Sequence, residues 1–398
     1  MTDQAAARRN ILILTAAQAL GAASPPIIIS LGGIVGQTLS PVAALATLPV
    51  SLYNLGLAMG TIPAAMVMRR LGRRTGYLFG ASIGVVSGLV ATLGIVGAAF
   101  VVFCLGTFMA GFYGAYVQSY RFAAADAATG ALKAKAISWV MIGGLAAAVI
   151  GPQLVIWTRD VLPAAPFAGS FLSQAALALL ALPVLMMLRT PRPAVPAAGV
   201  QAGGRPLGEI MRTPRFILAV AAGVVSYGLM SFVMTAAPMA MVGCGFTVGE
   251  AAFGIQWHVL AMFAPSFFTG NLIARFGKEQ ITAFGLVLIA TSGVVALAGL
   301  DLGNFYVSLI LLGLGWNFGF IGATAMITDC HTPEERGKVQ GANDFIVFGT
   351  VAIASFSSGS LLTSAGWEVI NWMIFPIVAM VLLPLVWSAA RKRRLGAA

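Results

Sequence analysis

Long apolar runs alternate with short polar segments along the whole chain. Each run extends over about 20 residues or more, the length that a helix needs to cross a hydrocarbon core about 30 Å thick. Twelve such runs occur, at residues 11–35, 42–68, 77–96, 100–124, 137–157, 167–188, 217–241, 251–273, 281–300, 305–327, 339–362 and 369–387. The pattern predicts an all-α membrane protein with twelve transmembrane helices.

A polar stretch that contains Pro, Gly and Arg separates the sixth run from the seventh. It divides the predicted helices into two equal sets. We therefore predict an N-terminal six-helix bundle at residues 1–188, a cytoplasmic linker at 189–215 and a C-terminal six-helix bundle at 216–398.

The composition supports a lipid environment. Hydrophobic residues make up 59% of the chain and charged residues 9%, and the mean hydropathy is +0.93. A soluble domain has about a quarter charged residues. A soluble fold of this composition would expose large apolar patches to water, so its surface must contact lipid instead.

The net charge of +11 is informative through the positions of the basic residues. Of the 23 Lys and Arg residues, all except Arg121 and Arg159 lie in the two tails or in alternate loops. Positively charged loops stay in the cytoplasm, so we expect a multi-pass protein of the inner (cytoplasmic) membrane with both termini cytoplasmic. There is no basic helix face with stacking aromatic residues, and we expect no nucleic-acid partner.

The sequence carries no sign of an enzyme or of a bound cofactor. A P-loop, an HExxH motif and a GxSxG motif are all absent, and the three cysteines include no CxxC pair. We predict a non-enzymatic protein without a cofactor.

The two halves of the chain form an internal repeat. Residues 70–74 (RLGRR) and 275–279 (RFGKE) are 205 positions apart, and the same offset relates Lys133 to Lys338 and Gly144 to Gly349. Parallel repeats of six spans suit a protein in which one half rocks against the other around a central site.

The repeat resembles the Major Facilitator Superfamily of secondary transporters, over essentially the whole chain. That family has a G-x-L-A-D-R-x-G-R-R pattern after its second span, of which this chain keeps Arg70, Gly72, Arg73 and Arg74; the second copy keeps Gly270, Leu272, Arg275, Gly277 and Lys278. The chain departs from the pattern at Ala65, Arg69 and Ala274, so both motif aspartates are missing. The resemblance implies two pseudo-symmetric six-helix bundles and transport by alternating access.

Charged groups at the cytoplasmic ends of the helices are candidates for a gate. We expect Asp126 to pair with Arg73 or Arg69, and Asp329 to pair with Arg275 or Lys278, in contacts that break when this side opens. The alternative is a solvated charged surface, since exposed ion pairs contribute only about 0 to 1 kcal/mol. The candidate gate comprises Arg70, Gly72, Arg73, Arg74, Asp126, Arg275, Gly277, Lys278, Asp329 and Arg336.

Two spaced pairs in the second half are candidate ligands for a soft metal. Met230 and Met234 are four residues apart, as are His258 and Met262, so each pair lies on one helix face. Thioether and imidazole groups without a carboxylate suit Cu(I). The alternative is that these methionines are adaptable apolar packing. The spacing also resembles the CcoA-type branch of the superfamily, which implies import of copper, as substrate, for cytochrome oxidase assembly.

The main alternative is a proton-coupled transporter of a small organic solute. Tyr113, Tyr116 and Tyr120 form one face that we expect to line a water-filled cavity, and Asp344 is the candidate proton carrier, with a helix-start carboxylate as its other interpretation. The other candidate substrate-binding residues near the middle of the spans are Gln18, Tyr53, Asn54, Gln118, Arg121, Trp316, Asn317 and Asn343. For Arg121 the alternative is a side chain that snorkels to the cytoplasmic surface.

A hypothesis from another class is a membrane sensor or assembly protein that kept the fold without transport. The missing motif aspartates favour it. We expect the protein to act as a monomer in each case.

Overall fold

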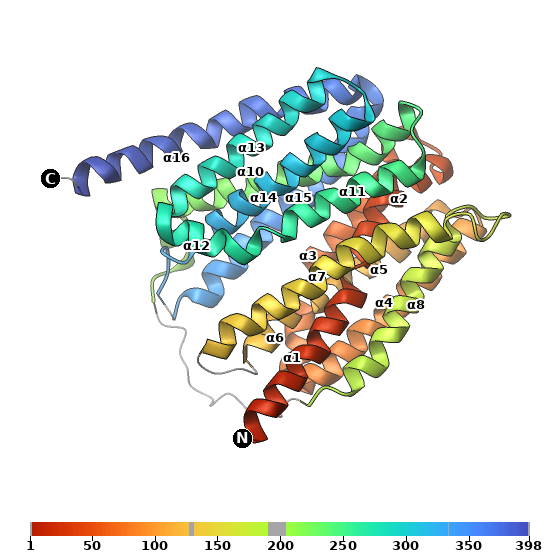
Figure 1. Cartoon of the computed structure of the whole chain (residues 1–398), viewed down its shortest axis with the longest axis horizontal. Coiled ribbons are helices and arrows are strands. Elements are labelled where there is room, and N and C mark those ends of the chain that lie inside the picture. Colours follow the sequence, from red (N-terminus) through yellow and green to blue (C-terminus); the bar gives the residue numbers. More distant parts are fainter. Residues whose placement is uncertain (1, 127–130, 190–203, 333, 397–398) are drawn as a thin grey trace. The chain divides into compact units, whose positions relative to one another are not determined.

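In the computed structural model, which describes residues 2–126, 131–189, 204–332 and 334–396, the regular elements are all helices (Figure 1). Within lipid, only helices or closed barrels satisfy every backbone N–H and C=O group, and these apolar runs form helices. In chain order they are α1 (Thr2–Gly21), α2 (Ser24–Leu39), the 3₁₀ turn η1 (Ala43–Leu45), α3 (Leu48–Leu71), α4 (Arg73–Val96), α5 (Phe100–Gln118), α6 (Tyr120–Asp126), α7 (Ala131–Thr158), α8 (Ala168–Met186), α9 (Leu207–Met211), α10 (Pro214–Gly243), α11 (Val248–Phe263), α12 (Ser266–Phe276), α13 (Lys278–Ala298), α14 (Leu302–Ile327), α15 (Arg336–Trp372) and α16 (Ile374–Gly396).

The spanning helices agree with the predicted spans. Ten described helical segments are long and apolar enough to cross a membrane, and α11 with α12 makes an eleventh that bends by 43°. The last segment, Lys338–Ser388, has 51 residues. A straight helix of that length would measure about 77 Å, more than twice the hydrocarbon thickness. Gly366, with φ 83° and ψ 178°, interrupts it and separates the eleventh predicted span from the twelfth.

Contacts divide the chain into two compact units, each of which we describe by itself. Unit 1 comprises Met1–Val195 and Pro238–Leu260, and unit 2 comprises Pro196–Ala237 and Ala261–Ala398. The predicted boundaries of the two six-helix bundles stay a prediction.

The core of unit 1 includes a segment that the sequence assigns to the second bundle. Ala252 of α11 belongs to the same buried cluster as Ile27 of α2 and Phe103 of α5. The Gln153 Nε2 atom of α7 donates a hydrogen bond of 2.9 Å to Gln256 Oε1 of α11. The part of α11 up to Leu260 therefore packs as part of unit 1.

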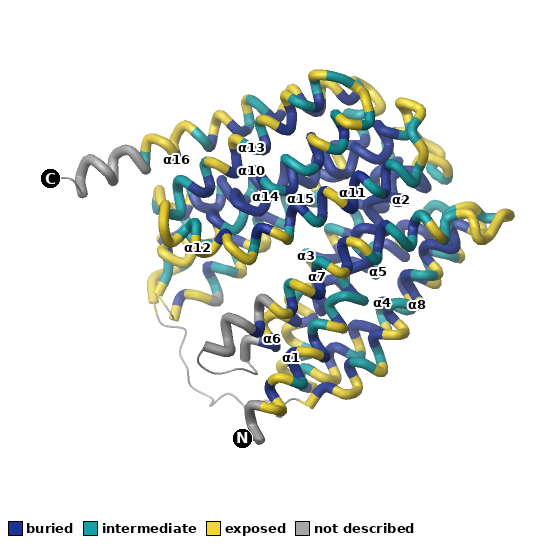
Figure 2. Tube along the Cα trace, viewed as in Figure 1, coloured by how far each residue is buried: buried dark blue, intermediate teal, exposed yellow. Residues whose placement is uncertain are grey.

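Helices in unit 1 approach one another through small residues. Gly56 of α3 and Gly111 of α5 lie against backbone atoms of the partner helix, which close crossing in a membrane requires. In unit 2, Gly285 of α13 and Gly315 and Gly319 of α14 form a similar contact. Figure 2 shows the buried residues along the helices. Of the ten described spanning segments, α10 has the largest share of buried residues in its apolar stretch, 72%.

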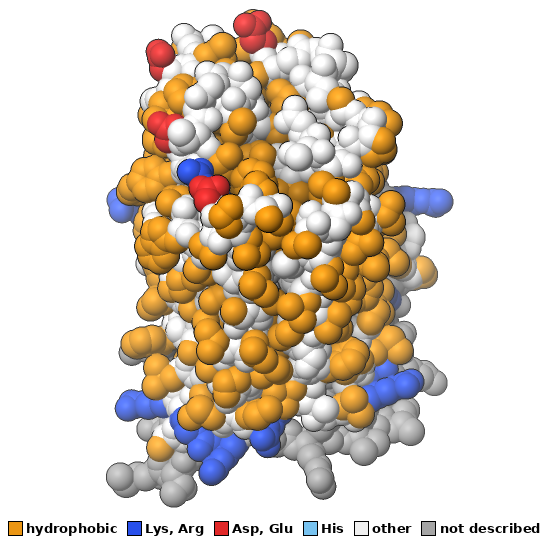
Figure 3. Space-filling view, turned by 90° about the vertical axis from the view of Figure 1, so that its right-hand side faces the viewer, with side chains coloured by type: hydrophobic (Ala, Val, Ile, Leu, Met, Phe, Trp, Pro, Cys, Tyr) orange, Lys and Arg blue, Asp and Glu red, His pale blue; other side chains and the backbone are white. Residues whose placement is uncertain are grey.

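The surface of the described residues is apolar in the middle. On the face that Figure 3 shows, hydrophobic side chains cover the central part, several Lys and Arg side chains lie near the lower end, and acidic side chains lie near the upper end. This distribution suits a protein that spans a bilayer. The cytoplasmic location of the termini stays a prediction.

Candidate functional site

Five aromatic side chains of unit 2 form one cluster, which we call the aromatic cluster: Tyr227, Phe263, Trp316, Phe320 and Phe348. The ring of Tyr227 has centroid distances of 5.4 Å to Trp316, 5.0 Å to Phe320 and 5.7 Å to Phe348, each in an edge-to-face arrangement. Phe263 lies 6.0 Å from Trp316. Such distances and angles are favourable for aromatic pairs.

Four helices contribute to the aromatic cluster. Trp316 and Phe320 are one turn apart on α14, and their rings are stacked with an interplanar angle of 17° and a centroid distance of 5.4 Å. Tyr227 comes from the middle of α10, Phe348 from α15, and Phe263 is the last residue of α11. The cluster therefore depends on the packing of unit 2 and not on a local motif.

A network around Asn317 fixes the bend between α11 and α12. The break before Ser266 leaves the Met262 carbonyl without its usual helical donor. Asn317 Nδ2 donates to this carbonyl (2.5 Å) and to Ser266 Oγ (2.7 Å), and Thr269 Oγ1 donates to Asn317 Oδ1 (2.6 Å). Both ends of the Asn317 amide take part in these hydrogen bonds, which hold the chain beside Phe263 and Trp316. The predicted contact of Asn317 with substrate stays a prediction.

Six buried side-chain polar atoms of unit 2 have no hydrogen-bond partner among the described residues, and two of them bear on the aromatic cluster. One is the indole Nε1 of Trp316, whose side chain belongs to a residue that is 7% exposed. The other is the hydroxyl of Ser231, one turn from Tyr227 on the same face of α10. Buried polar groups of this kind call for an explanation, and a polar ligand is one.

The predicted copper ligands are all buried. Met230 and Met234 of α10 and Met262 of α11 belong to unit 2, and His258 of α11 belongs to unit 1. Met230 and Met234 lie on the face of α10 that carries Tyr227. The metal site itself stays a prediction.

The predicted tyrosine face packs inside unit 1 and does not line an open cavity. Tyr113, Tyr116 and Tyr120 are at most 2% exposed. The rings of Tyr113 and Tyr116 lie against Gly84 and Gly80 of α4. Tyr120 packs edge-to-face on Tyr77 at 4.7 Å. The spacing identified one face correctly, but that face contacts α4.

The other predicted substrate-binding residues of unit 1 are dispersed. Arg121 is exposed on α6, with its guanidinium 4.8 Å from the centroid of the Phe122 ring, and both interpretations of it stay predictions. Tyr53 belongs to the buried core cluster. The half-buried residues are Gln18, Asn54 and Gln118.

In unit 2, Asn343 is buried, and its Nδ2 atom donates a hydrogen bond of 3.0 Å to Asp344 Oδ1. The Asp344 side chain is exposed. The protein itself therefore does not enclose this carboxylate, and its role in proton coupling stays a prediction.

The two glycine turns of the repeat have nearly the same conformation. Gly72, between α3 and α4, has φ 84° and ψ 159°, and Gly277, between α12 and α13, has φ 96° and ψ 155°. Residues with a side chain rarely adopt this conformation, which explains a glycine at both positions. The turns confirm the repeat at this point.

Asp329 forms an ion-pair network at the end of α14. Its carboxylate is 2.6 Å from Lys278 Nζ of α13 and 2.6 Å from Arg215 Nη2 of α10. The predicted pairing with Lys278 is confirmed, and Arg215 is an additional partner. Arg275 instead lies over the ring of Phe276 at 5.2 Å. The network joins three helices of unit 2 at one end.

The remaining candidate gate residues lie at the surface. Arg70 and Arg74 are exposed and Arg73 is half-buried. Arg336 Nε is 3.4 Å from Gln340 Oε1. The side chain of Asp126 lies outside the described residues. A gating role for the set stays a prediction.

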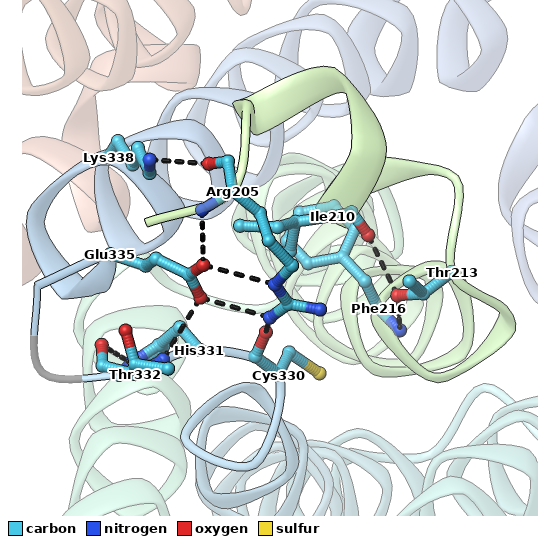
Figure 4. Close-up of polar contacts among 9 residues, drawn as sticks. All are labelled: Arg205, Ile210, Thr213, Phe216, Cys330, His331, Thr332, Glu335 and Lys338. Atoms are coloured by element: carbon cyan, nitrogen blue, oxygen red, sulfur yellow. Dashed lines mark hydrogen bonds and ion pairs between the residues drawn. The ribbon is translucent and has the colours of Figure 1, made fainter. Parts of the chain in front are cut away.

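A second charged cluster, around Glu335, was not predicted from the sequence (Figure 4). The Glu335 carboxylate accepts hydrogen bonds from the backbone N–H of Arg205 (2.7 Å), from Arg205 Nε and Nη2, and from the backbone N–H of Thr332. Lys338 Nζ donates to the Arg205 carbonyl. Arg205 lies within the predicted linker, so this cluster attaches the linker to the segment before α15. No local motif indicates it, because 130 residues separate the partners.

These hydrogen bonds predict a stability that depends on pH. The Arg205 guanidinium, with the Thr332 and Arg205 backbone N–H groups, lowers the pKa of Glu335 from 4.5 to about 2. The ionised carboxylate therefore stabilises the folded protein fully above pH 4.5, and this contribution is lost as the pH falls towards 2. We expect Glu335→Gln to lower the unfolding temperature at neutral pH. The unfolding temperature of this variant should also decrease less than that of the native protein between pH 4.5 and about 2. Scans at several pH values, with exposed Glu368→Gln as control, measure the difference. Equal pH profiles of Glu335→Gln and the native protein would contradict this assignment.

Comparisons with known proteins identify relatives along the whole chain. Residues 221–397 match the Major Facilitator Superfamily. The chain is 70% identical, over 386 residues and 97% of both chains, to the riboflavin transporter RfnT of Brucella anthropi. It is 29% identical to the uncharacterised transporter YdeG of Bacillus subtilis, covering 96% of this chain and 93% of YdeG.

The fold of this chain is similar to that of a transporter of known structure. A mutant of the nucleoside transporter NupG superposes with a TM-score of 0.69, covering 95% of this chain and 99% of NupG at 16% sequence identity. At this identity the likeness concerns the fold alone.

Proposed function

Because this chain belongs to the Major Facilitator Superfamily of transporters, we propose that it carries riboflavin across the cell membrane by alternating access. The chain is a multi-pass transporter and not an enzyme, as its relatives and its apolar helices establish. The observation that carries the proposal is the similarity to the riboflavin transporter of Brucella anthropi, which extends over nearly the full length of both proteins.

The chemistry of unit 2 suits this substrate. Riboflavin is an uncharged molecule with a flat tricyclic ring and a polyol chain. Sites for such ligands are mostly aromatic and apolar, with a few polar groups that fix the orientation. The aromatic cluster has this character, and its Trp316 indole Nε1 has no hydrogen-bond partner among the described residues.

This proposal replaces copper import as the main hypothesis. The similarity to a riboflavin transporter favours the organic-solute alternative. Met230 and Met234 then have the simpler role of adaptable apolar side chains on the face of α10 that also carries Tyr227.

Transport by the purified full-length protein in liposomes tests the proposal. We expect saturable flux of radiolabelled riboflavin that competes with unlabelled riboflavin and does not change when Cu(I) or a copper chelator is added. Liposomes without protein provide the control. Flux of copper in the absence of any riboflavin flux would overturn the proposal and restore the metal hypothesis.

A further inference from the structure

We propose that the aromatic cluster of unit 2 binds the tricyclic ring of the substrate, so that the transporter recognises riboflavin by its ring and not by its polyol chain. This inference rests on the proposed function and assigns the substrate's ring to specific residues. Three observations carry it: an asymmetry between the repeats, partly exposed rings, and unpaired polar atoms.

The first observation is that the cluster is absent from the equivalent positions of the other repeat. The offset of 205 residues, fixed by the Gly72 and Gly277 turns, relates the five cluster positions to small residues in the first half. In the order Tyr227, Phe263, Trp316, Phe320 and Phe348, the counterparts are Ala22, Ala58, Gly111, Ala115 and Gly143.

These small counterparts serve helix packing. A Cβ atom on Gly111 would lie 2.1 Å from the Tyr53 carbonyl oxygen, and one on Gly143 would lie 2.3 Å from the Thr15 carbonyl oxygen. The repeat fold is therefore built in unit 1 without a large side chain at any of the five positions. Aromatic residues at all five positions of unit 2 go beyond what the fold requires, which indicates a function.

The second observation is the exposure of the rings. Tyr227, Phe263, Phe320 and Phe348 are each only half-buried, although they contact one another or Trp316. These residues thus retain exposed surface on which a flat ligand can stack. A stacked ring gains dispersion and quadrupole interactions while it replaces water or lipid on an apolar surface.

The third observation is the pair of unpaired polar atoms. Within the described part of the chain, Trp316 Nε1 is a donor without a partner, and the Ser231 hydroxyl, one turn from Tyr227, can donate and accept. The flavin ring carries two carbonyl oxygens and several ring nitrogens that match such groups. An unpaired indole alone does not mark a site, since Trp367 Nε1 is also buried and unpaired. Among the described residues, Trp367 has a ring contact with Phe305 and does not belong to the aromatic cluster.

Trp367 therefore provides a matched control for Trp316. Both are buried tryptophans of unit 2 with an unpaired Nε1, and only Trp316 belongs to the aromatic cluster. Trp316→Phe keeps a ring and removes the donor, whereas Trp316→Leu removes the stacking surface as well. Tyr227→Leu tests the same surface from α10 if Trp316→Leu does not fold.

Binding is measured by titrating the purified full-length protein with riboflavin and following flavin fluorescence, which stacked indole and phenol rings quench. We expect Trp316→Leu to raise Kd about tenfold or more and Trp316→Phe to raise it about fivefold, with Trp367→Phe unchanged. In the liposome assay, a flavin ring without the ribityl chain should inhibit riboflavin flux, whereas ribitol in large excess should not. Thermal unfolding of each variant checks that it is folded.

The possible failures are distinct. If the native protein transports riboflavin but Trp316→Leu and Tyr227→Leu bind it with native Kd, the ring site is wrong and the proposed function stands. Inhibition by ribitol and not by the bare ring would also overturn the ring site. If the native protein shows no riboflavin flux, the proposed function fails first.

Discussion

Replacing Gly111 with alanine is expected to destabilise unit 1 by about 3 kcal/mol or more and to remove most of the folded protein from detergent extracts. The added Cβ atom would lie 2.1 Å from the Tyr53 carbonyl oxygen and 2.6 Å from the Leu57 backbone nitrogen of α3. Backbone atoms cannot rotate away as a side chain can. The helices α3 and α5 must therefore separate, which loses the packing that holds helices together in lipid. Size-exclusion profiles and unfolding temperatures of the purified variant measure the effect.

Gly144→Ala in α7 is the matched control. A Cβ atom there meets nothing within 4 Å, and alanine favours a helix over glycine by about 1 kcal/mol. This variant should be at least as stable as the native protein. Equal unfolding temperatures for Gly111→Ala and Gly144→Ala would show that the contact between α3 and α5 is not close in the folded protein.

The spans were predictable because lipid imposes a length and a composition on each of them. The apolar pattern alone placed the last two spans on either side of residues 363–368, where Gly366 breaks the helix. The glycine turns were predictable for a related reason: the repeat contains them twice, and both require a positive φ.

Contacts between helices were harder to predict. Helical spacing showed that Tyr113, Tyr116 and Tyr120 lie together, but not that the first two pack against Gly84 and Gly80. A face of polar-tipped rings suits both a cavity and a close helix contact, because tyrosine is apolar over most of its surface. Only the small residues on α4 distinguish the two.

The aromatic cluster was missed for a different reason. Only Trp316 of its five residues was selected from the sequence, since the other four are ordinary aromatic residues in apolar runs. Phe320 shares α14 with Trp316, and the other three come from three further helices. The signal was present in the repeat. When the two halves are aligned at the constant offset of 205 residues, each of these aromatic residues aligns with Ala or Gly. This comparison identifies positions where the second half has a large side chain that the fold does not need.

Asn317→Ala is expected to lower the free energy of unfolding by about 2 kcal/mol and to weaken riboflavin binding. The substitution leaves the Met262 carbonyl at the end of α11 without its donor and removes the partner of Thr269 and Ser266. The bend between α11 and α12 then loses its fixed geometry. Phe263 and Trp316, which are the neighbours of Met262 and Asn317 in the chain, shift relative to each other. Unfolding temperature and riboflavin titration measure the two effects separately.

The control for this prediction is Asn304→Ala. Asn304 Nδ2 also donates to a carbonyl, that of Val295 at 3.0 Å, but it is half-buried near the start of α14. Water can replace this hydrogen bond, so the variant should differ from the native protein by less than about 1 kcal/mol. A native unfolding temperature and a native riboflavin affinity for Asn317→Ala would show that α11 and α12 keep their bend without this amide, and that the position of Trp316 is set by aromatic packing alone.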